Sequence, residues 1–127
     1  MDEHSIIFVD DEKQIRAMYL RAFSAPGTRV RAVASAEECL EVMAKDPAPV
    51  LFWDLNLPGM DGVALCRRLR EGWPGLVIYA VTGYASRFDT EACRQAGFDD
   101  YFTKPVPLAD LRAAAVKAFS RSGEGAA

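Results

Sequence analysis

The sequence of 127 residues predicts a single α/β domain with a doubly wound parallel β-sheet, covered by helices on both faces. Short apolar runs alternate along the chain with stretches in which apolar residues recur at helical spacing. Two of the runs, residues 50–53 and 76–81, are apolar throughout, which is typical of parallel strands buried on both faces. The residues are 50% hydrophobic and 26% charged, which is a globular composition and not that of a disordered chain.

The first half of the chain predicts two strand–helix units. Residues 5–9 form the first strand, and the helix after it ends near Pro26 and Gly27, a pair that stops helices. Residues 29–34 form the second strand. Ser35, followed three residues later by Glu38, makes a capping box that begins the second helix, and Pro47 and Pro49 end it.

The second half predicts three more units in the same order. Strands are expected at residues 50–53, 76–81 and 101–103, and helices at 63–71 and 86–96, with Gly97 as the stop of the second. Pro107 suits the first turn of a last helix that runs to Phe119. Right-handed crossovers then give one parallel sheet. We expect the domain to cover residues 1–121, with residues 122–127 as a flexible tail or a truncated linker.

Charge and composition exclude several classes of function. A net charge of −3 gives no general attraction to nucleic acid or to an anionic membrane surface. The longest apolar run is far too short to cross a membrane, and the acidic start does not resemble a signal peptide, so we expect a cytoplasmic protein. Three scattered cysteines and one histidine provide too few ligands for zinc. The cysteines are expected to fill helix faces in a reducing compartment.

Polar residues follow four of the five predicted strands, and the carboxyl ends of parallel strands are where functional sites gather. They are Asp10 and Asp11, Asp54, Thr82, and Lys104. Taken singly, each of these residues has a structural explanation, for instance Asp11 as a helix cap. Their convergence on one edge of the sheet nevertheless favours a functional site. Three neighbouring carboxylates repel one another unless a cation is present, and Mg²⁺ fits oxygen ligands best. Such a site suits phosphoryl transfer, with Asp54 as the nucleophile.

Five segments together resemble the receiver domain of two-component response regulators, over about residues 5–119. They are Asp10-Asp11 after the first strand, Asp54 at the end of the third, residues 56–62 (Asn-Leu-Pro-Gly-Met-Asp-Gly), Thr82-Gly83, and residues 101–105 (Tyr-Phe-Thr-Lys-Pro). The resemblance implies a flavodoxin-like, CheY-like (βα)5 sandwich with a five-stranded parallel sheet of order 2-1-3-4-5.

The resemblance also implies a role for each matched position. Asp54 would accept phosphoryl, and Mg²⁺ would be bound by Asp11 directly, by Asp10 through water, by Asp54, and by the backbone carbonyl of Asn56. Lys104 and Thr82 would bind phosphoryl oxygens. Thr82 and Tyr101 would form the switch, and the bond before Pro105 would be cis.

The implied donor is a sensor histidine kinase or a histidine phosphotransfer protein, whose phosphohistidine supplies the phosphoryl group. Phosphorylation would switch the surface of the fourth helix, fifth strand and last helix for a downstream effector protein or a covalently linked output domain. The resemblance implies no direct nucleic acid and no membrane partner, and self-association into a homodimer is left open. Such a chain is a switch that promotes its own phosphorylation and dephosphorylation, and not an enzyme.

The residues give less support to two alternative functions. A phosphatase of the haloacid dehalogenase type also uses an aspartate nucleophile with Mg²⁺, but it needs a second Asp where Asn56 stands. A flavin-binding module of similar fold needs a phosphate-binding loop after the first strand, where Asp10, Asp11 and Glu12 would repel a phosphate.

Overall fold

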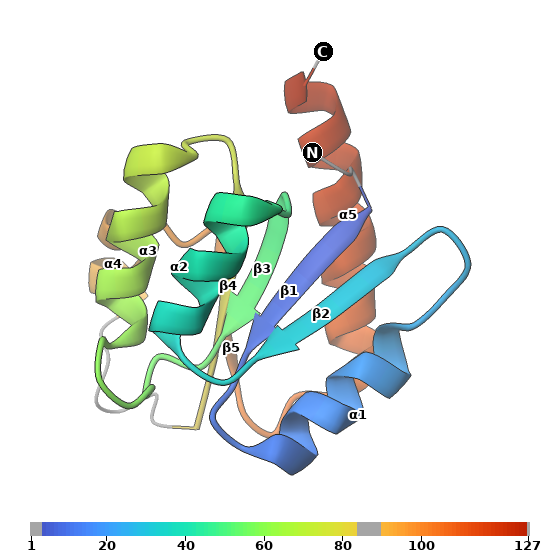
Figure 1. Ribbon diagram of the computed structural model, residues 1–127, viewed down its shortest axis with the longest axis horizontal. Coiled ribbons are helices and arrows are strands. Elements are labelled where there is room, and N and C mark those ends of the chain that lie inside the picture. The colour runs from blue at the N-terminus through green and yellow to red at the C-terminus, as the bar shows by residue number, and fades with distance from the viewer. Residues whose placement is uncertain (1–3, 84–89, 127) are drawn as a thin grey trace.

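The strands of the computed structural model form one parallel sheet, as the sequence predicts. The structure describes residues 4–83 and 90–126. The sheet has the order β2-β1-β3-β4-β5 (Figure 1). The strands are β1 (Ser5–Val9), β2 (Arg29–Val33), β3 (Val50–Trp53), β4 (Val77–Thr82) and β5 (Asp100–Thr103).

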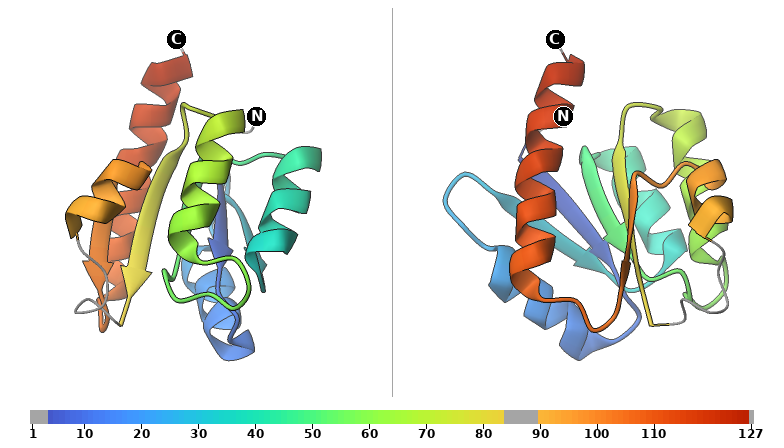
Figure 2. Two further views of the ribbon diagram at one scale, coloured as in Figure 1. Left: turned by 90° about the vertical axis from the view of Figure 1, so that its left-hand side faces the viewer. Right: turned by 180° about the vertical axis from the view of Figure 1, so that it is seen from behind.

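Helices cover both faces of this sheet. They are α1 (Lys13–Phe23), α2 (Ala36–Lys45), α3 (Gly62–Gly72), α4 (Thr90–Ala96) and α5 (Leu108–Ala126). Helices α1 and α5 lie on one face, and α2, α3 and α4 lie on the other (Figures 1 and 2). The predicted fold class is therefore confirmed. Residues 86–89 of the helix expected at 86–96 lie outside the described residues.

The last helix differs most from the expectation. It continues to Ala126, through residues that the sequence predicts as a tail. Gly123 and Gly125 have low helix propensity, which is why the sequence favours an end before them. Pro107 precedes the helix and does not lie inside its first turn; its carbonyl accepts the Asp110 amide at 3.0 Å.

The hydrophobic core is divided between the two faces of the sheet. Strands β1, β3 and β4 are buried along their whole length, so alternate residues pack on opposite sides. On the side of α1 and α5, aromatic rings form a row in which Phe8 stacks on Tyr19 and Phe52, and Phe52 contacts Tyr79. Because three strands are packed on both faces, the residues at their carboxyl ends are held on a rigid base.

The connection from β3 to α3 is fixed by close backbone packing. The Gly62 amide donates to the Leu55 carbonyl at 3.0 Å, and the Trp53 indole N–H donates to the Gly62 carbonyl at 2.8 Å. Asp61, which the sequence assigns to a loop, caps α3 because its carboxylate accepts the Ala64 amide at 2.8 Å. These contacts hold the loop that follows Asp54.

Arg70 of α3 ties the start of β4 to the approach to β5. Its guanidinium donates to the carbonyls of Gly97 and Leu76 and forms an ion pair of 2.8 Å with Asp99. The Asp99 carboxylate also accepts the Ile78 amide at 2.8 Å. The partly buried Asp99 is thus matched by a cation and a backbone donor.

The three cysteines form no disulfide with one another and are buried on α2, α3 and α4, as the sequence predicts. Burial raises the pKa of Cys39 to about 12 and that of Cys66 to about 11, so both thiols are protonated and unreactive at neutral pH. Among the residues that the structure describes, no helix is long and apolar enough to span a membrane.

Candidate functional site

Lys104 joins two of the predicted carboxylates at the carboxyl edge of the sheet. Its ammonium lies 2.9 Å from an Asp54 oxygen and 3.9 Å from an Asp10 oxygen. Burial lowers the pKa of Lys104, but its hydrogen bond to Asp54 and the charges of Asp54 and Asp10 outweigh burial and raise it. Lys104 is therefore a permanent cation at the place where Asp10 and Asp54 converge.

Asp10 is the most buried of the acidic groups, with 4% of its surface exposed. One carboxylate oxygen accepts the Glu12 amide at 2.9 Å, and the Arg16 guanidinium donates to the Asp10 carbonyl at 2.9 Å. Desolvation raises the pKa of Asp10 above its usual value, although the Glu12 amide and Lys104 oppose it. The site therefore holds a buried carboxylate that is short of positive charge.

The other two predicted residues at this edge of the sheet are Thr82 and Pro105, which flank the backbone of Lys104. Thr82 is completely buried at the end of β4, and its carbonyl accepts the Lys104 amide at 2.8 Å. The bond between Lys104 and Pro105 is cis, the geometry that the resemblance to receiver domains implies. The backbone of Lys104 is thus attached to β4 while its side chain extends to the β3 end.

The two other expected metal ligands, Asp11 and Asn56, are exposed. The backbone N–H of Asn56 donates to an Asp54 carboxylate oxygen at 2.9 Å. Within residues 4–83 and 90–126, no three His, Cys, Asp or Glu side chains form a group that could hold a metal ion. The structure brings Asp10 and Asp54 together at Lys104, whereas Asp11 remains outside this cluster because it lies on a solvent-facing bend.

Tyr101, the expected switch residue, is half-buried in β5 and packs against the core on the α2–α4 side. Its hydroxyl is buried and has no hydrogen-bond partner among the described residues. Burial raises the pKa of Tyr101, so the hydroxyl is neutral at physiological pH. The structure therefore places the Tyr101 ring against the hydrophobic core on that side of the sheet.

Sequence reasoning did not identify Tyr19 as a neighbour of the site. Helical spacing places it on the core face of α1, and there it lines a narrow crevice together with Asp10 and Asp54. The helical pattern gives the direction of this side chain but not how far the ring reaches. No signal in the sequence distinguishes it from the other core residues of α1.

The burial of Asp10 gives a testable effect on stability. A raised pKa in the folded state means that folding favours the protonated form, so Asp10 destabilises the protein at neutral pH and this penalty fades as the pH falls toward 4. Asp10→Asn keeps an oxygen for the Glu12 amide and removes the charge. In metal-free buffer at pH 7 we expect the melting temperature to rise by about 2–5 °C.

Thermal unfolding from pH 4 to 8, with chelator and with Mg²⁺, measures this effect. The advantage of Asp10→Asn should shrink in acid, and Mg²⁺ should stabilise the wild type more than the variant. Asp99→Asn is the matched control and should lower the melting temperature, because Asp99 is paired with Arg70. If Asp10→Asn melts at or below the melting temperature of the wild type at neutral pH, the charge of Asp10 does not destabilise the folded protein.

Comparison with known proteins agrees with this geometry. Residues 6–116 match the family model of the response regulator receiver domain. The chain is 36% identical over 109 residues to the TorCAD operon transcriptional regulatory protein TorR of Escherichia coli O157:H7, and 35% identical over 108 residues to the response regulator MprA of Mycobacterium leprae. Each match covers 85% of this chain and 46% or 47% of the relative, so the chain spans about half the length of these proteins.

Solved structures of receiver domains superpose on almost the whole chain. A CheY-like receiver domain protein from Methanospirillum hungatei JF-1 has a TM-score of 0.88 at 28% identity, covering 95% of this chain and 97% of that one. The receiver domain of the TMAO respiratory system response regulator TorR has a TM-score of 0.84 at 33% identity, covering 93% and 98%. The matches give no support to the alternative of a dehalogenase-type phosphatase. The chain belongs to the response regulator receiver domain family, the phosphoryl-accepting domains of two-component signal transduction.

Proposed function

We propose that Asp54 is the residue that accepts phosphoryl in this chain. The observation that supports it is the ammonium of Lys104, fixed 2.9 Å from one oxygen of Asp54 while the Asn56 amide binds the other. A carboxylate held between two donors at the mouth of a buried strand is oriented for attack. Lys104 is also placed to neutralise charge on an incoming phosphoryl group.

The reaction is an in-line displacement at phosphorus. A bond forms between an Asp54 oxygen and phosphorus, and the phosphorus–nitrogen bond of a phosphohistidine breaks. The electron pair of that bond leaves with the imidazole, which takes a proton from solvent. The Thr82 hydroxyl and the Lys104 ammonium are proposed to bind the phosphoryl oxygens, so the chain promotes its own phosphorylation.

Magnesium is the metal that the donor set fits. The candidates are the carboxylates of Asp10, Asp11 and Asp54 and the carbonyl of Asn56, all of them hard oxygen ligands. Asp10 supports the fit because it is buried without a full counter-charge, and Asp11 is the exposed carboxylate that follows it in the chain. When bound, the ion would neutralise the negative charge of the phosphoryl oxygens.

The partners follow from this role. A sensor histidine kinase or a histidine phosphotransfer protein would supply the phosphoryl group. Thr82 and Tyr101 are proposed to pass the change to the surface of α4, β5 and α5, which an effector or a covalently linked output domain would bind. That MprA and TorR are about twice as long as this chain supports a linked output domain, following a receiver unit at residues 1–121.

Intact mass measured after treatment with acetyl phosphate tests the proposal. With Mg²⁺ the chain should gain one phosphoryl group, and with chelator in place of Mg²⁺ the gain should fall at least about tenfold. Acetyl phosphate replaces the unidentified kinase. Absence of any mass gain with Mg²⁺, or repeated turnover of a simple phosphate ester, would contradict a phosphoryl-accepting switch.

A further inference from the structure

The turn between β1 and α1 carries three acidic residues in succession, Asp10, Asp11 and Glu12. Two of them are proposed metal ligands, so the path of this turn decides how close their oxygens come to one another. Among the described residues, the N-cap of α1, Glu12, makes no side-chain cap hydrogen bond that would fix the start of the helix. Because neighbouring carboxylates also repel one another, the turn needs another contact to hold it in place.

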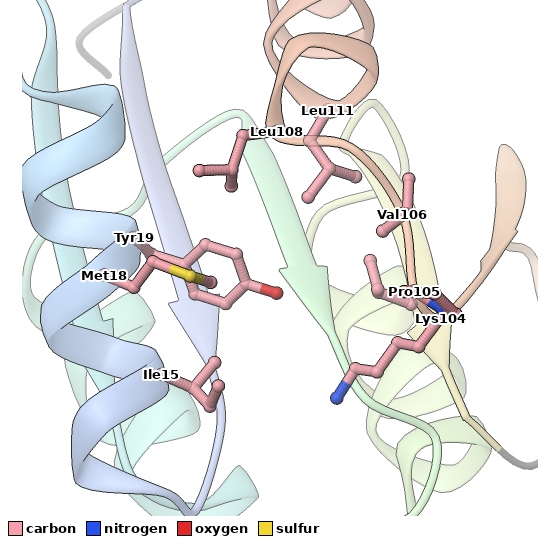
Figure 3. A pocket seen from close by; sticks show the side chains of 9 residues that line it. Ile15, Met18, Tyr19, Lys104, Pro105, Val106, Leu108 and Leu111 are labelled. Carbon is pink, nitrogen blue, oxygen red and sulfur yellow. The ribbon is translucent and has the colours of Figure 1, made fainter.

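Packing on one side of α1 gives this turn little support. A mainly apolar pocket of about 420 Å³ lies between α1 and the start of α5. Ile15 of α1 and Lys104 line opposite sides of this pocket, and the Lys104 side chain extends toward α1 (Figure 3). Ile15, in the first turn of the helix, therefore faces open space here and not a packed neighbour. The position of the turn depends correspondingly more on polar contacts.

Arg16 provides such contacts. Its side chain is half-buried, and its guanidinium donates to the Asp10 carbonyl at 2.9 Å, while its own backbone N–H donates to the Glu12 carbonyl at 3.1 Å. Arg16 thus binds the turn on both sides of Asp11. Neither bond uses a carboxylate oxygen, in contrast to the Glu12 amide, which donates to the Asp10 carboxylate at 2.9 Å. The Arg16 contacts can therefore persist when the carboxylates bind a cation.

We propose that Arg16 is a positioning residue of the magnesium site, which holds the turn between β1 and α1 so that the carboxylates of Asp10 and Asp11 can bind one ion. This inference rests on the proposed function, because the same carboxylates are the proposed ligands. The guanidinium charge acts in the opposite direction, since it repels a divalent cation. Solvent and salt weaken that repulsion at a half-buried position, whereas a hydrogen bond from a charged donor is among the stronger ones. Positioning should therefore outweigh repulsion.

Arg16→Met tests this role, because it keeps an unbranched side chain of similar helix propensity but removes the hydrogen bond and the charge. Mg²⁺ alone is titrated into the full unphosphorylated chain by calorimetry, and we expect its Kd to rise about tenfold. Arg16→Lys keeps a donor for the Asp10 carbonyl and should stay within about threefold of the wild type. Equal Mg²⁺ affinity in Arg16→Met would mean that Arg16 has only a structural role, and tighter binding would mean that its charge dominates. Either result overturns the inference.

Arg21→Met is the matched control, because it removes the same charge from an exposed position in the last turn of α1 and should leave the Mg²⁺ affinity unchanged. If Arg21→Met weakens Mg²⁺ binding as much as Arg16→Met does, the positioning role is wrong. With acetyl phosphate as donor, the Mg²⁺ concentration for half-maximal phosphorylation should rise about tenfold in Arg16→Met. The rate at saturating Mg²⁺ should stay within about twofold of the wild type. A wild type that binds no Mg²⁺ would instead contradict the proposed magnesium site itself.

Discussion

Asp54→Asn is expected to abolish phosphoryl incorporation from acetyl phosphate in the presence of Mg²⁺. An amide oxygen is a far weaker nucleophile than a carboxylate and forms no stable phosphoryl ester. Asn keeps an oxygen for the Asn56 amide, which in the wild type donates to Asp54 at 2.9 Å, so the fold should survive. Intact mass should show less than about one hundredth of the wild-type incorporation.

A second aspartate provides the control for this substitution. Asp110→Asn makes the same chemical change at an exposed position in the first turn of α5, away from Lys104, and should leave incorporation unchanged. The wild-type product should be released by hydroxylamine, as an acyl phosphate is. Full incorporation in Asp54→Asn would mean that another side chain is phosphorylated, and the proposed role of Asp54 would then be wrong.

The order of strands and helices could be predicted because the pattern of this sequence is locally consistent. Apolar runs such as Val50–Trp53 fit only strands with both faces covered, and Ser35 with Glu38 indicates a helix start that the structure confirms. The predicted ends of the helices and strands were less accurate. Glycines at 123 and 125 disfavour a helix, yet α5 continues through them to Ala126.

The sequence predicted the convergence of three of the site residues but not the details of their contacts. Strand ends place Asp10, Asp54 and Lys104 on one edge, and the structure brings these three together. Sequence position could not indicate that Lys104 spans both carboxylates while Asp11 faces solvent, because side-chain reach depends on tertiary packing. The same limit applies to Tyr19, whose helical spacing predicts burial but not proximity to the site.

Gly62→Ala is expected to give the largest loss of stability among the substitutions considered. A Cβ built on Gly62 would lie 2.7 Å from the Leu55 Cα and 3.0 Å from the Asp54 carbonyl oxygen, both of them backbone atoms that cannot rotate away. The third neighbour is the Trp53 ring, also at 3.0 Å, whose indole N–H donates to the Gly62 carbonyl. Relieving the overlap means moving α3 away from β3, at a cost of about 2–3 kcal/mol.

Gly72→Ala supplies the comparison inside the same helix, because nothing lies within 4 Å of a Cβ at that position. It should raise stability by up to about 1 kcal/mol, since alanine restricts the unfolded chain and favours helix. Thermal unfolding should place Gly62→Ala about 10 °C below the wild type. It should also slow phosphorylation, because the overlap displaces the backbone of Asp54. If Gly62→Ala instead melts with the wild type, the close contact between α3 and the end of β3 is not what positions the acceptor.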